Sequence, residues 1–286
     1  MMTVLFDGIA SGMLLFLISV GLSVTLGLMN FVNLAHGAFA MVGGYVCVTL
    51  LNQFGVPFLV SLPLAALLTA GVGVVLERTL YRRLYAATHL DQVLFSISLV
   101  FMSIAAAHYF FGPQQQPLTL PEFLRGQIKL PGLDMGVYRL FLIVVSLAIA
   151  LGLQRMVSGT RFGAQLRAAV DNPRAARGVG INVERIFTLT FALGSALAGL
   201  GGAMGVEMLG LDPGFPVKYV VYFLIVVAVG GSGSIVGSLV ASLILGVVDV
   251  AGKYYVPQIG AFLIYAVMVV MLVVRPQGLF GRRAAR

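Results

Sequence analysis

Asn30, Asn33 and His36 form the most polar interruption of this apolar chain, and Gly37 follows them. The three side chains recur at i, i+3 and i+6, so in a helix they would share one face. Polar groups inside membrane segments are costly and are therefore candidate functional groups. Broken backbone at membrane depth is tolerated where it lines a cavity. The pattern predicts the wall of a solute pathway. A turn at the membrane interface, with Asn and His capping helix ends, accounts for the same residues, and the sequence leaves both interpretations open.

A second polar segment lies at 230–237, where Ser232 and Ser234 stand among four glycines. Serine and glycine suit a tight turn, and they also suit a broken helix with exposed backbone donors. We assign Ser232 and Ser234 as further pathway candidates, although a turn alone explains the segment.

Catalytic motifs are missing from the chain. It has no G-x-x-x-x-G-K-[ST] loop, no H-E-x-x-H, no C-x-x-C and no G-x-S-x-G. The three histidines, His36, His89 and His108, are scattered, and the single cysteine, Cys47, lies in an apolar run and is expected to be a packing residue. We therefore expect a protein that is not an enzyme and that holds no cofactor and no metal.

The composition explains what must position these residues. Hydrophobic residues make up 59% of the 286, charged residues 10%, and the mean hydropathy is +1.02. A soluble domain carries about 25% charged residues, so the chain is predicted to be an all-α bundle of eight or nine membrane spans. Residues 1–7 lack the basic segment of a secretory signal, so the first apolar run is expected to remain as a span. The predicted spans are 6–28, 33–51, 56–76, 91–111, 138–157, 185–207, 218–231, 234–251 and 258–274.

The basic residues orient this bundle. Thirteen of the 18 lie in three clusters, at 78–83, 155–185 and 275–286. Nine crossings place all three clusters on one side, which the positive-inside rule identifies as the cytoplasm. The N-terminus is then periplasmic and the C-terminus cytoplasmic, in a bacterial inner membrane. This distribution argues against nucleic-acid binding, which uses a basic stripe on one surface.

Two loops and one repeat pattern complete the organisation. The segment 112–137 carries four prolines and is predicted to be an irregular periplasmic cap. In 159–184, an amphipathic helix from 161 to 170 is followed by Asn172-Pro173 and a second helical stretch at 174–179. This flat pair must pack on lipid headgroups or on a soluble partner. Three spans at each end of the chain match at a shift of about 198 residues, which suggests a parallel internal repeat.

Small residues at four-residue spacing predict close helix packing in lipid. Gly194, Ala198 and Gly202 form one such series, and Ser195, Gly199 and Ala203 form another.

Four blocks of sequence resemble one known family. Residues 27–45 read GLMNFVNLAHGAFAMVGGY, residues 167–182 read RAAVDNPRAARGVGIN, residues 229–237 read VGGSGSIVG, and residues 275–281 read RPQGLFG. In this order they are similar to the permease subunits of branched-chain amino acid ABC importers, in particular the LivH-type subunit. The likeness covers nearly the whole chain.

The resemblance implies a heterodimer with a related permease subunit, two cytoplasmic ATP-binding subunits and a periplasmic substrate-binding protein. It identifies 159–184 as the cytoplasmic coupling segment, which would dock on the ATP-binding subunit, and the loop 112–137 would face the binding protein. One departure is that Arg167 stands where the wider importer pattern has Glu before Ala168-Ala169. The residues assigned to coupling are Arg161, Arg167, Ala168, Ala169, Asn172, Pro173, Gly178 and Gly180.

The leading hypothesis is therefore a permease subunit of an ATP-driven importer for branched-chain or other neutral amino acids. The alternative is a self-sufficient secondary carrier or channel for a small neutral solute such as urea or a short amide. Carboxylates lie near the ends of the predicted spans, so a buried proton relay is not evident. A membrane scaffold without transport is a third class, and flux through the chain alone would distinguish these hypotheses.

Overall fold

The computed structural model describes residues 1–29, 31, 33–85, 87–131 and 133–280. Within these ranges the chain forms eleven α-helices, two short 3-10 helices and one two-stranded antiparallel sheet. The α-helices are α1 (Met2–Met29), α2 (His36–Asn52), α3 (Phe58–Thr79), α4 (His89–Phe111), α5 (Val137–Gly159), α6 (Arg161–Asp171), α7 (Pro173–Gly178), α8 (Val183–Leu209), α9 (Phe215–Gly230), α10 (Ile235–Tyr255) and α11 (Gly260–Val274). The remaining elements are η1 (Tyr81–Leu84), η2 (Glu122–Leu124), β1 (Gln127–Leu130) and β2 (Leu133–Gly136).

Each of the nine predicted spans corresponds to one helix, which confirms the all-α membrane fold. Six of the nine, α1, α3, α4, α5, α8 and α10, are long and apolar enough to cross a membrane. The other three, α2, α9 and α11, have 17, 16 and 15 residues. A helix of 17 residues is only about 25 Å long, less than the roughly 30 Å of hydrocarbon. The choice between eight and nine crossings therefore stays a prediction.

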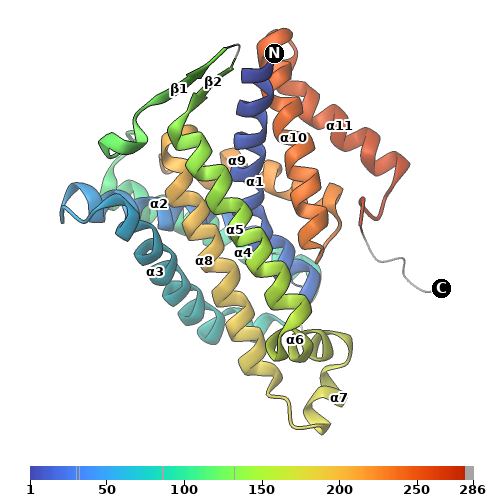
Figure 1. Cartoon of the computed structure of the whole chain (residues 1–286). Helices are drawn as coiled ribbons and strands as arrows, with labels where there is room; N and C mark the ends of the chain where they lie inside the picture. Colours follow the sequence, from blue (N-terminus) through green and yellow to red (C-terminus); the bar gives the residue numbers. More distant parts are fainter. Residues whose placement is uncertain (30, 32, 86, 132, 281–286) are drawn as a thin grey trace.

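The bundle has two distinct ends (Figure 1). At the hairpin end, the amide of Asp134 in β2 donates to Thr3 near the N-terminus, and the side chain of Asn52 donates to the carbonyl of Pro117. At the opposite end, here called the α6 end, α6 and α7 project beyond the spans. Part of the predicted irregular cap at 112–137 is thus an ordered hairpin, because Gln127–Leu130 pairs with Leu133–Gly136 in register.

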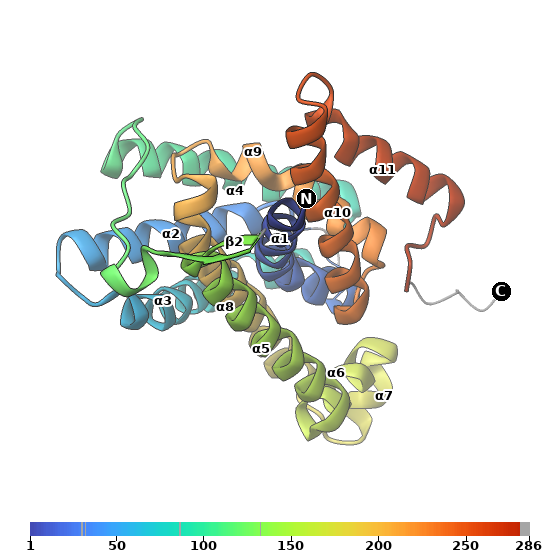
Figure 2. The same ribbon diagram turned by 45° about the horizontal axis from the view of Figure 1, so that its top comes forward.

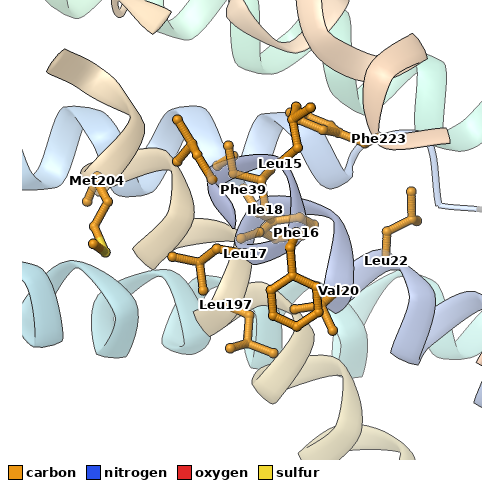
Figure 3. Close-up of a cluster of buried hydrophobic side chains, with 14 of the residues drawn as sticks. Leu15, Phe16, Leu17, Ile18, Val20, Leu22, Phe39, Leu197, Met204 and Phe223 are labelled. Carbon is orange, nitrogen blue, oxygen red and sulfur yellow. The ribbon is translucent and has the colours of Figure 1, made fainter. Parts of the chain in front are cut away.

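α1 is the central helix of the bundle. Figure 3 shows side chains of α1 from Leu15 to Leu22 enclosed by Phe39 of α2, Leu197 of α8 and Phe223 of α9. Of the most apolar part of α1, 83% is buried, against 17% for α4 and 22% for α5. Such an all-round apolar helix is stable only inside a bundle, so α3, α4, α5 and α11 form its outer wall.

Glycines let the central helices approach closely, as the small-residue series predicts. A Cβ added at Gly202 would lie 1.8 Å from the carbonyl oxygen of Ala40, and one at Gly43 would lie 2.2 Å from that of Gly199. Gly194 packs against Thr25 and Gly21 in the same way. The repeat hypothesis stays a prediction, because α1 has 28 residues while α9, in the corresponding position, has 16.

Candidate functional site: the coupling helices and the polar turns

The helix pair α6–α7 is defined by its own capping residues. The hydroxyl of Thr160 accepts a hydrogen bond from the amide of Gly163 at 3.2 Å and so begins α6. The side chain of Asn172 accepts from the amide of Ala175 at 3.0 Å, and Pro173 occupies the first turn of α7. A proline there costs no hydrogen bond, because the first amides of a helix are unpaired. The break predicted at Asn172-Pro173 is therefore the cap between two helices.

α6 and α7 are fastened to the bundle by a small hydrophobic cluster that is separate from the main core. The cluster consists of Leu166, Ala169, Ala176, Val183 and Ile186. It joins both short helices to the first turn of α8. Arg167 also donates to the carbonyl of Val157 near the end of α5. Movement of α6–α7 is thereby linked to α5 and to α8.

The opposite surface of the α6–α7 pair is exposed to solvent. Arg161, Arg174 and Arg177 are exposed, and Val179 is 78% exposed. No atom lies within 4 Å of a Cβ added at Gly178. Figures 1 and 2 show this tip extending away from all the spans. This exposed face thus carries three arginines and one valine.

A cavity of about 300 Å³, here called the α6-end cavity, lies between α6 and the polar turn after α9. Its wall includes Arg167 and Asp171 of α6 together with Ser232, Ser234 and Gly27. The predicted pathway residues Ser232 and Ser234 therefore lie against the predicted coupling helix. Ser234 also begins α10, because its hydroxyl accepts from the amide of Gly237 at 2.9 Å.

The C-terminal motif closes this turn. The amides of Leu279 and Phe280 donate to the carbonyls of Val229 and Gly230, at 2.7 and 3.2 Å. These carbonyls end α9 and would otherwise lack partners. Gly278 has a φ of 78° and lies against Gly231, where a Cβ would come within 2.6 Å of the backbone nitrogen. The described part of this block, residues 275–280, thus caps the end of α9.

The structure places Asn33 and His36 in contact with protein groups. Each is 2% exposed. The side-chain oxygen Oδ1 of Asn33 accepts from the Tyr81 hydroxyl at 2.9 Å, and His36 Nε2 lies 2.7 Å from the backbone carbonyl oxygen of Ile18 in α1. Gly37 packs on Pro216, the start of α9. Asn30 lies outside the described residues. The pathway role of this group stays a prediction, since Asn33 and His36 are enclosed in this conformation.

Sequence reasoning missed a buried carboxylate. Glu77, at the end of α3, is 1% exposed. It accepts hydrogen bonds from the hydroxyls of Thr188 in α8, at 2.7 Å, and Tyr85, at 2.8 Å. Burial raises the pKa of Tyr85 and the hydrogen bond to Glu77 raises it further, so the phenol remains a donor. The only local signal was a carboxylate directly after an apolar run.

We expect Glu77→Ala to lower the free energy of unfolding by about 1–3 kcal/mol, because it leaves the half-buried Tyr85 hydroxyl without its acceptor. The Thr188 hydroxyl keeps a hydrogen-bond acceptor in this variant, since it also donates to the carbonyl of Glu184. The measurement is the temperature at which half of the monodisperse protein is lost on heating. The control is Glu184→Ala, which removes an exposed ion pair with Arg82 worth about 0–1 kcal/mol. Equal losses in the two variants would show that the Glu77 network contributes nothing specific.

Residues 4–272 match the model of the family described as branched-chain amino acid transport system / permease component. The chain belongs to this family. The branched-chain amino acid permease protein BraD of Pseudomonas aeruginosa is 28% identical, over 97% of this chain and 95% of its own length. LivH of Escherichia coli K12 is 26% identical, over 97% of this chain and 94% of its own.

The permease protein LivM of Escherichia coli K12 is also similar, at 25% identity over 93% of this chain and 68% of its own length. The chain therefore resembles both permease components of one transport system, and more closely the LivH type. No solved structure matches it. Family and apolar helices together show a multi-pass membrane protein of the ABC permease type, confirming the resemblance described above.

Proposed function

We propose that the chain is the non-catalytic permease subunit of an ATP-driven importer that carries branched-chain or other neutral amino acids across the bacterial inner membrane. Support comes from the family and from relatives named as branched-chain amino acid permeases over almost their full length. The energy for transport comes from ATP hydrolysis by partner subunits.

The observation that carries this proposal is the construction of α6–α7. One face is fixed to α8 by a separate hydrophobic cluster and to α5 by the hydrogen bond from Arg167 to the carbonyl of Val157. The other face presents Arg174, Arg177 and Val179 to solvent. An element that transmits motion from a partner to the spans needs these two properties: a rigid attachment to the spans and a free contact surface. The ATP-binding subunit is the proposed partner of the free surface, and the attachment transmits its motion to the spans.

The orientation follows from charge. The basic residues of 78–83 and of the α6–α7 region lie at the α6 end, and Arg82 pairs there with Glu184 at the start of α8. Phe280, close to Arg275, lines the α6-end cavity. A concentration of arginine at one end supports a cytoplasmic α6 end. The N-terminus is then periplasmic and the C-terminus cytoplasmic.

The proposed assembly contains a second, related permease subunit, two ATP-binding subunits and a periplasmic substrate-binding protein, with membrane lipid around the spans. The similarity of this chain to both LivH and LivM supports pairing of two related permeases. The hairpin end, with β1 and β2, faces the binding protein.

The alternative is a carrier that works alone, and reconstitution separates the two. Proteoliposomes that hold the whole assembly are expected to take up leucine only with ATP and loaded binding protein. Proteoliposomes that hold this chain alone are expected to take up neither leucine nor urea. Flux of either solute through the chain alone contradicts the proposal and favours the carrier.

A further inference from the structure

A cavity of about 620 Å³ opens at the hairpin end between α1, α5, α8 and the segments 120–127 and 134–136. Its volume is in the range of small-molecule sites, about 300–1,000 Å³. In the proposed orientation it faces the side from which an importer receives its substrate. The inference that follows rests on that proposed function.

One wall of this cavity is apolar. It is formed by Leu120 and Leu124, which are 7% and 4% exposed, together with Met208 and the ring of Tyr138. The Tyr138 hydroxyl donates to the carbonyl of Met204 inside the bundle and leaves the ring as the contact surface. Aliphatic and aromatic carbon on one side of a site suits an aliphatic side chain.

The charged groups of the cavity divide into paired and unpaired ones. Asp7 of α1 forms an ion pair with Arg139 of α5 beneath the hairpin. Arg125, after η2, Asp134, in β2, and Glu207, near the end of α8, also line the cavity. None of these three forms an ion pair within the described part of the chain. One unpaired guanidinium and two unpaired carboxylates therefore face one space from separate elements, and only Glu207 among the carboxylates lies on a helix of the bundle.

Three other cavities in the described part of the chain lack this combination. A cavity of about 450 Å³ beside α2 and α4 is lined by Met41, Phe110 and similar residues and has no charged group. One of about 400 Å³ near the start of α8 has three arginines and a single carboxylate, Glu184, which is paired with Arg82. In the α6-end cavity, the guanidinium of Arg167 already donates a hydrogen bond to the carbonyl of Val157.

We propose that the hairpin-end cavity binds a free, zwitterionic amino acid with an aliphatic side chain. Arg125 binds the α-carboxylate, since a guanidinium presents two parallel donors to it. Glu207 accepts from the α-ammonium group, and Leu120, Leu124 and Met208 contact the side chain. This cavity is then the first site that the substrate occupies on the permease after it leaves the binding protein.

The test uses the permease assembly purified from the membrane without the binding protein. Three probes are compared: leucine, leucinamide, which lacks the carboxylate, and 4-methylpentanoate, which lacks the ammonium group. Each is titrated while the thermal midpoint of the assembly is followed, because a ligand of the folded state raises that midpoint. Leucine is expected to give a saturable rise, and the two analogues are expected to give a much weaker one.

Variants test whether the leucine-induced rise in the thermal midpoint arises from the hairpin-end cavity. Arg125→Gln and Glu207→Gln are each expected to weaken the leucine response by about tenfold to a hundredfold, the loss of one charge-assisted hydrogen bond. The matched controls are Lys129→Gln and Glu122→Gln, which change the same charges in the same segment outside the cavity lining. Both controls are expected to keep the wild-type response.

Three results overturn the proposal. The first is a wild-type assembly that does not respond to leucine, and the second is a response that all four variants retain. The third is an unchanged leucine response with weakened docking of the binding protein in Arg125→Gln and Glu207→Gln, which would make the cavity a protein contact. ATP-dependent leucine uptake by the wild-type assembly is measured in parallel. If that uptake is intact, only this inference fails, whereas its absence removes the proposed function.

Discussion

Replacing Gly202 by valine is expected to prevent the chain from reaching a stable folded state. A Cβ at this position would lie 1.8 Å from the carbonyl oxygen of Ala40 and 2.8 Å from its Cα. The obstacle is backbone, so no side-chain rotation relieves it, and α2 must separate from α8. Overpacking in cores costs about 1–3 kcal/mol and occasionally more, and a clash between two helix backbones belongs at the upper end.

The measurement is the yield of monodisperse protein after detergent extraction, with its thermal midpoint. Gly152→Val is the matched control, because Gly152 lies in α5 and nothing is within 4 Å of its added Cβ. The control is expected to behave like the wild type. Equal yield and midpoint for Gly202→Val would show that α2 and α8 do not pack as described.

The second large effect is expected at the α7 tip. Arg177→Glu reverses an exposed charge that has no ion-pair partner within the described residues. We expect ATP-driven leucine uptake to fall at least about tenfold, because misplaced charges across a contact cost several kcal/mol. The abundance of the protein should be unchanged, since the side chain is exposed and outside the α6–α7 hydrophobic cluster.

Arg83→Glu is the control for this variant. Arg83 is also exposed and lies at the same end of the bundle, in η1, away from α6 and α7. Uptake by Arg83→Glu is expected to stay near the wild-type level. An equal loss in both variants would point to the charge of the whole end and not to a contact at the tip.

Local signals explain why the helices and the coupling segment could be predicted. Apolar runs bounded by glycine, proline and arginine locate all nine apolar helices. The caps of α6 and α7 involve residues three positions apart, Thr160 with Gly163 and Asn172 with Ala175. Such capping contacts can be predicted from the sequence, because both partners lie within a few residues of each other.

The remaining features depend on contacts between distant segments. Asn33 is bonded to Tyr81, 48 positions away, and Glu77 to Thr188, 111 positions away. A single sequence carries no record of such pairs. The hydrogen-bond partners of Asn33 and His36 were therefore not predictable, and Asn33 does not share a helix face with His36, because α2 begins only at His36.

The hairpin-end cavity was beyond prediction for the same reason. Arg125 and Glu207 are 82 residues apart, and they line one cavity because the loop after α4 lies against the end of α8. The ordered hairpin was also missed, because four prolines in 112–137 argued for an irregular loop. β1 and β2 lie between Pro121 and α5, with Pro131 in the turn that joins them.

The central claim is that α6–α7 transmits the energy of ATP hydrolysis to the spans. The most direct measurement is ATP hydrolysis by the reconstituted assembly, with and without loaded binding protein, for the wild type and for Arg177→Glu. Stimulation by loaded binding protein is expected in the wild type and is expected to be lost in the variant, together with leucine uptake. Stimulated hydrolysis with intact uptake in Arg177→Glu would contradict the coupling role of this helix pair.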